Sequence, residues 1–181
     1  MEDEQYTALK TAMGEALVSF KELRLTVAED VPYSDGPLII ERFSDRVDDI
    51  VGWLEEMSES LSDCLFHLSK GQDRDNVRKA LVFCQSQGNK IASTFCRDLM
   101  SYETIRELRR VGRRNGPEWI AWGLSLERAL EACKLPIDSL QRALIGAWNE
   151  VAKQVTSGIV VTNTSIGIDA RPTSGDRLPG A

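Results

Sequence analysis

A heptad rhythm of apolar side chains between Phe43 and Leu68 constrains the fold more than any other feature of this sequence. Successive members lie three or four residues apart, and the residues between them are largely charged. Residues spaced in this way share one side of an α-helix, and so regular a seam is built to pack against other helices. The seam consists of Phe43, Val47, Ile50, Leu54, Met57, Leu61, Leu65 and Leu68. We therefore expect a bundle of long helices.

Three further stretches repeat the pattern, and together they predict an all-α fold. The four predicted helices cover about 3–28, 38–69, 73–112 and 117–155. In the third stretch the seam passes through Leu99, Tyr102 and Ile105 without a break. Short connections favour antiparallel neighbours, so the prediction is an elongated up-down-up-down four-helix bundle with heptad packing over 1–156. Pro136 lies inside the last stretch, and since the apolar phase continues across it, we expect a kink.

Residues 157–181 have a different character and are predicted to form a tail. The segment 159–168 is rich in β-branched residues without a helical stripe, and its alternation predicts a strand. Such a strand has no sheet of its own, so it pairs with another copy, joins a partner's sheet or stays disordered. Its expected contact residues are Ile159, Val160, Val161, Thr162, Thr164, Ile166 and Ile168. Residues 169–181 are expected to be disordered.

Length and composition limit the classes of protein to which this chain can belong. The 181 residues suit one domain, and no apolar run reaches the length of about 20 residues that a membrane-spanning helix needs. The acidic start at residues 1–4 is unlike a secretory signal, so we expect a cytoplasmic protein with reduced cysteines and no membrane partner.

The net charge of −6 hides a strong asymmetry. Residues 1–72 carry 6 basic and 16 acidic side chains, whereas 73–116 carry 10 basic and 5 acidic ones. The densest positive charge is formed by Arg106, Arg109, Arg110, Arg113 and Arg114. Arginines near a helix C-terminus are favoured by its dipole, but five of them exceed what a dipole requires. They therefore predict a surface for an acidic partner or for phosphate groups.

The sequence contains few features that are typical of an enzyme. We therefore expect no catalytic residues, no metal and no cofactor. The motifs typical of phosphate loops, dinucleotide folds, hydrolases and zinc proteases do not occur. His67 with Cys64, Cys84, Cys96 or Cys133 suggests a soft metal site, but cysteines on apolar seams are more often small hydrophobes. The acidic pairs Asp48–Asp49 and Glu55–Glu56 suggest a divalent-ion or acid–base site, but such carboxylates usually form a solvated helix face.

Tryptophans are the remaining candidates for contact residues. At heptad positions tryptophan is more often core, and Trp119 and Trp122 are the two that we expect to be partly exposed. The sequence as a whole favours a non-enzymatic interaction protein, an adaptor or a small subunit of a larger assembly, which binds another protein or itself. Two alternatives stay open: a nucleic-acid-associated bundle that uses the Arg106–Arg114 stripe, and a metal or small-ligand bundle that uses His67 and the cysteines.

Overall fold

The protein is built from helices. The computed structural model describes residues 2–28, 32, 38–69 and 74–164, and at 2, 3, 5, 38, 64–69, 74 and 154–164 it describes the helical backbone alone. The helices are α1 (Glu2–Ala28), α2 (Leu38–Ser69), α3 (Arg74–Thr94), the π-helix η1 (Phe95–Leu99), α4 (Tyr102–Asn115) and α5 (Pro117–Thr164). The described part of the chain contains no strand, so the predicted all-α class is confirmed.

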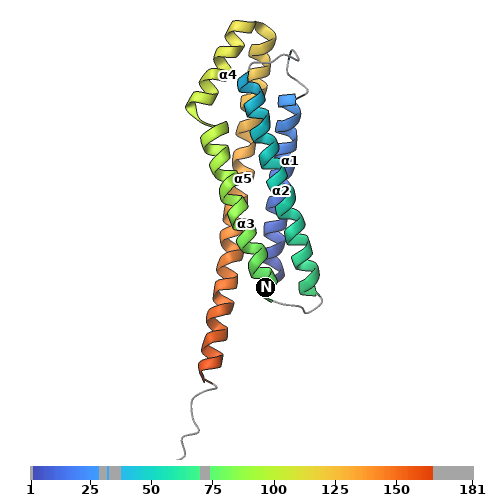
Figure 1. Cartoon of the computed structure of the whole chain (residues 1–181), viewed down its shortest axis with the longest axis vertical. Helices are drawn as coiled ribbons and strands as arrows, with labels where there is room; N and C mark the ends of the chain where they lie inside the picture. The colour runs from blue at the N-terminus through green and yellow to red at the C-terminus, as the bar shows by residue number, and fades with distance from the viewer. Residues whose placement is uncertain (1, 29–31, 33–37, 70–73, 165–181) are drawn as a thin grey trace, which may run out of the picture.

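The four longest helices lie side by side, and successive ones run in opposite directions (Figure 1). α1 contacts α2 and α5, α2 contacts α3, and α3 contacts α5, so the four enclose one core. α4 lies beyond the end of α3 and packs on the N-terminal part of α5 (Figure 1). The last turns of α5 extend past the ends of the other helices at the opposite end of the molecule (Figure 1).

The heptad seam of α2 forms the centre of the core. Its members from Phe43 to Leu61 are all buried, whereas the side chains of Leu65 and Leu68 lie outside the described ones. The rings of Phe20 and Phe95 meet edge to face at 5.8 Å between centroids, which joins α1 to the π-helix. The spacing of the apolar residues was therefore sufficient to identify the buried face of α2.

The single helix predicted over 73–112 is wrong, because the chain breaks at Met100 and Ser101. The Met100 N–H donates to the Phe95 carbonyl oxygen, 2.9 Å away, which closes a π-helical turn. Ser101 then adopts an extended conformation and its hydroxyl accepts from the Thr104 N–H at 3.2 Å, which begins α4. The π-helical turn and the break after it shift the following residues around the helix axis. Tyr102, which the heptad spacing placed on the buried seam, is therefore 77% exposed.

The strand predicted over 159–168 is also wrong for 159–164, because α5 continues as a helix to Thr164. Helix elongation gives each added residue a backbone hydrogen bond, whereas a strand without a neighbour gains none. β-branched residues oppose this by at most about 0.7 kcal/mol each. The residues Ile166 and Ile168 and the expected disorder over 169–181 lie outside the described residues.

Pro136 lies inside α5 and does not end it. The ring removes one N–H donor from the helical ladder, and the residues on both sides remain helical. α5 is therefore one continuous element that contacts α1, α3 and α4.

Candidate functional site

The arginines singled out in the sequence lie on α4, which is held against α5 by a short hairpin. α4 buries Leu108, Val111 and Gly112, and its arginines are exposed. Gly116 makes the turn into α5 with φ of 105°, a conformation that residues other than glycine rarely adopt. The hairpin thus presents the basic side of α4 to solvent at the end of the molecule opposite the last turns of α5 (Figure 1).

Arg109 holds the hairpin together. Its Nε and one terminal nitrogen donate to the two Glu127 carboxylate oxygens at 2.7 and 2.8 Å, a fork-to-fork pair between α4 and α5. The hydrogen bonds from Arg109 lower the pKa of Glu127, and Glu127 in turn raises the pKa of the guanidinium. One member of the predicted stripe therefore has a structural partner within the chain.

The other four arginines form what we call the arginine face: Arg106, Arg110, Arg113 and Arg114. Arg106 lies over the ring of the exposed Tyr102, 5.8 Å from its centroid, and Arg110 makes a loose 3.4 Å ion pair with Glu107 one turn away. Within the described residues Arg113 and Arg114 make no ion pair. The face therefore keeps most of its positive charge for an external group.

A polar cleft of about 920 Å³ lies beside the start of α4, between α2 and the π-helix. Arginines and carboxylates share its walls. The charged and polar lining residues are Arg42, Asp45, Arg46, Asp48, Asp49, Arg97, Asp98, Ser101, Glu103 and Thr104. Sequence reasoning missed this cleft, because it depends on the break at Met100. The one available signal was Ser101 followed by Glu103, a pattern typical of a helix N-terminus.

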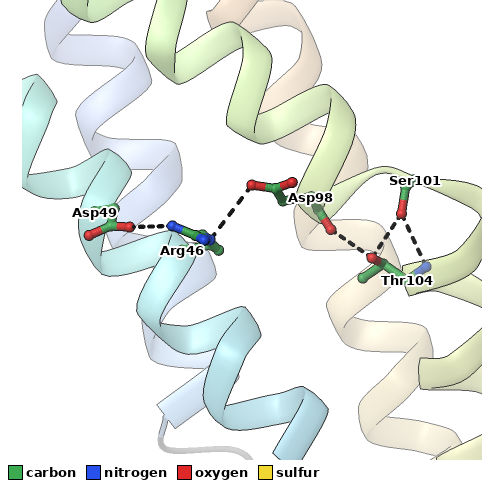
Figure 2. A network of polar contacts seen from close by, with 5 residues as sticks. All are labelled: Arg46, Asp49, Asp98, Ser101 and Thr104. Atoms are coloured by element: carbon green, nitrogen blue, oxygen red, sulfur yellow. Dashed lines mark hydrogen bonds and ion pairs between the residues drawn. The ribbon is translucent and has the colours of Figure 1, made fainter.

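One arginine of the cleft pairs with two of its carboxylates (Figure 2). Arg46 reaches from α2 to Asp49 at 3.1 Å and across the cleft to Asp98 at 3.6 Å. The hydroxyl of Thr104 donates to the Asp98 carbonyl oxygen at 2.7 Å and accepts from the Ser101 hydroxyl. These contacts tie α2 to the junction of α3 and α4, so the network positions the arginine face.

The two acidic pairs are not assembled into sites. Each carboxylate contacts a different neighbour, as expected of a solvated helix face. The contacts are Asp48 with Arg24 at 2.7 Å, Asp49 with Arg46 at 3.1 Å, Glu55 with Lys21 at 2.8 Å, and Glu56 with Gln87 at 2.9 Å. In the described residues no group of three His, Cys, Asp or Glu side chains is arranged to hold a metal.

The cysteines whose side chains are described do not converge either. The thiol of Cys84 donates to the Met57 carbonyl oxygen, and that of Cys133 to the Ser19 carbonyl oxygen. Burial raises the pKa of the Cys133 thiol to about 12, so it is protonated at neutral pH. Cys96 is exposed on the π-helix, and the side chains of His67 and Cys64 lie outside the described ones.

The expected exposure of Trp119 and Trp122 is wrong. Both are buried, their rings meet edge to face at 5.7 Å, and the Trp122 indole donates to the Thr26 carbonyl oxygen at 2.9 Å. The pair joins the end of α1 to the start of α5. Trp148, near the other end of α5, is instead 38% exposed.

Comparison with known proteins gives no further guidance. The chain matches no family model, no curated protein and no solved structure. None of the described helices combines the length and the apolar character needed to cross a membrane.

Proposed function

We propose that this chain is a non-enzymatic interaction protein of the cytosol, an adaptor or a small subunit of a larger assembly. In this proposal the arginine face binds an acidic segment of a partner protein, and the helical body acts as its rigid support. The guanidinium group donates in a planar fork that matches a carboxylate, which favours arginine over lysine at such contacts.

The observation that carries the proposal is the accumulation of unneutralised guanidinium groups on one short helix. Arg106, Arg110, Arg113 and Arg114 are all exposed within three turns of α4, and Glu107 is the one carboxylate that pairs among them. An exposed ion pair contributes little by itself because water and salt screen it. Several arginines on a fixed surface act together, so a partner with clustered carboxylates is the one that this surface fits best.

A second candidate, nucleic acid, gains support from Tyr102. This ring is exposed beside Arg106, and exposed aromatic rings next to arginine form stacking platforms for unpaired bases. The net charge of −6 opposes binding to a polyanion over any wider surface. We therefore place an acidic protein segment ahead of nucleic acid.

Charge reversal tests the proposal. Arg110→Glu combined with Arg113→Glu removes half of the arginine face, and Arg128→Glu combined with Arg142→Glu makes the same charge change on exposed positions of α5. The probes are a fluorescent oligoglutamate peptide and a single-stranded oligonucleotide of equal length, titrated at about 50 and 200 mM salt. We expect the peptide to bind the wild type and the α5 control, and to lose at least about tenfold in affinity for the α4 variant.

The outcomes separate the candidates. Equal losses in both variants would show that the net charge matters and the arginine face does not, and would overturn the proposal. A tight oligonucleotide complex with a steep salt dependence, abolished by the α4 variant and by Tyr102→Ala, would instead establish the second candidate.

A further inference from the structure

The C-terminal part of α5 extends away from the helical body. Among the residues of α5 whose side chains are described, Ala147 is the last that is fully buried, and Val151 still packs partly against the core. Beyond it, residues 154–164, which we call the α5 extension, continue as helix past the ends of α1, α2 and α3 (Figure 1). The extension therefore lies where no other described helix of the same chain covers it.

The composition of the α5 extension does not suit a helix that is alone in water. Its eleven residues carry no charge, and most of them are Val, Ile, Thr, Ser, Gly or Asn. These are weak helix formers, and isolated helices shorter than about 12–15 residues are marginal even when rich in alanine. At the same time the apolar spacing of the bundle continues through Trp148, Val151, Val155 and Ile159. A helix with these properties requires a second apolar surface.

A matching surface lies at the base of the α5 extension. α3 and α5 touch at Gly88, whose carbonyl oxygen accepts from the Gln141 side chain at 2.8 Å. Toward the extension they enclose an apolar groove of about 350 Å³, lined by Val82, Gln85, Ile145 and Trp148. Val82 and Ile145 are half-exposed, so the groove presents apolar surface that the described part of the chain leaves uncovered.

The groove and the α5 extension of one molecule do not meet. The extension continues α5 in the direction away from the groove, and a continuous helix cannot fold back on itself. Two copies related by a two-fold axis between Trp148 and Val155 satisfy both surfaces at once, because each extension then runs back along the α3–α5 face of the other copy. We propose that the chain forms a two-fold dimer in which the α5 extension of each copy occupies the Val82–Trp148 groove of its partner.

The length and the charge of the α5 extension both suit the partner's groove. The α5 extension spans about 16 Å at 1.5 Å per residue, which is long enough to cover the groove between Val82 and Gln85 of α3 and Ile145 and Trp148 of α5. Because residues 154–164 carry no charge, the extension brings no unpaired ion into the apolar groove. The dimer does not depend on the arginine face, which lies at the other end of the molecule (Figure 1).

The test measures the mass of the full chain by light scattering, with circular dichroism as the readout of folding. The wild type is expected to have the mass of two chains. Ile145→Glu in the groove, and Val155→Glu with Ile159→Glu in the extension, are each expected to have the mass of one. Leu135→Glu is the control on the same helix, since this residue is 68% exposed and lies outside the groove, and it should remain dimeric.

Mixing the two disrupted variants distinguishes mutual exchange from other dimers. The groove variant keeps an intact extension and the extension variant keeps an intact groove, so the mixture retains one of the two contacts and should associate. A monomeric wild type overturns the proposal. A dimeric wild type whose disrupted variants fail to associate on mixing, or whose Leu135→Glu control also dissociates, overturns it as well.

Discussion

Gly88 provides the strictest test of the packing between α3 and α5. A Cβ atom built on this buried glycine would overlap Cδ1 of Leu144, and the Gln141 amide nitrogen would lie 3.5 Å from it. Leu144 is itself buried and cannot turn into solvent. Gly14 in α1 is the matched control, because it is also inside a helix and a Cβ there meets nothing within 4 Å.

The expected change in the free energy of unfolding is the sum of two opposing effects. Replacing glycine by alanine inside a helix stabilises by about 1 kcal/mol. Forcing a methyl group into a filled core destabilises by about 1–3 kcal/mol. We therefore expect Gly14→Ala to raise the free energy of unfolding by about 1 kcal/mol. Gly88→Ala should leave it unchanged or lower it by up to about 2 kcal/mol.

Urea unfolding followed by circular dichroism measures this difference, and thermal unfolding should show it as a gap of about 2–4 °C per kcal/mol. Leu144→Val in the Gly88→Ala background should recover part of the loss, since the shorter side chain leaves room for the methyl group. Equal stabilisation by Gly88→Ala and Gly14→Ala would show that α3 and α5 are not in close contact, and the reasoning would fail.

Three further predictions concern single side chains. Ser101→Ala should destabilise the chain by about 1 kcal/mol, and Ser101→Asp should not, since the aspartate also caps α4; chemical denaturation compares the two. Because its pairing with Arg109 lowers the pKa of Glu127, the pair stabilises above the unfolded-state pKa, and this effect is lost as the pH falls through the lower folded-state value. Glu127→Gln should thus be destabilising at neutral pH, and a variant as stable as the wild type there would contradict this. A thiol reagent at neutral pH should modify Cys96 quickly and leave Cys133 intact until the protein unfolds, as peptide mapping by mass spectrometry would show.

The periodic parts of the fold were predictable from the sequence. The buried face of α2 followed from spacing alone, because a seam that repeats every three or four residues has one orientation in which it is buried. The break at Met100 was not predictable in this way, since a π-turn results from one hydrogen bond to Phe95 and leaves no mark in the composition. Its consequence, the exposure of Tyr102, was missed with it.

The predictions made from local sequence were wrong or incomplete where contacts with other helices determine the structure. The alternating Val, Ile and Thr residues of 159–164 indicated a strand, but α5 already supplies a helical end to extend. Trp119 and Trp122 were expected to be partly exposed because they lie near the loop end of the bundle, whereas both are buried and Trp122 bonds to the end of α1. The arginine face was located from sequence, but the engagement of Arg109 by Glu127 depends on a hairpin that only the structure reveals.

The continuity of α5 sets a distance between two contact surfaces. About 21 residues separate Glu127, where α4 is attached, from Trp148 at the groove, which corresponds to about 32 Å of helix. In the two-fold dimer, whose axis lies a few residues beyond Trp148, the two arginine faces would be on the order of 75 Å apart, at opposite ends. A flexible linker spans about 5–6 Å times the square root of its length, so roughly 150–200 residues are needed to bridge them. One partner chain with short spacing between its acidic segments would therefore engage a single face, and the dimer would recruit two partner molecules rather than bind one with avidity.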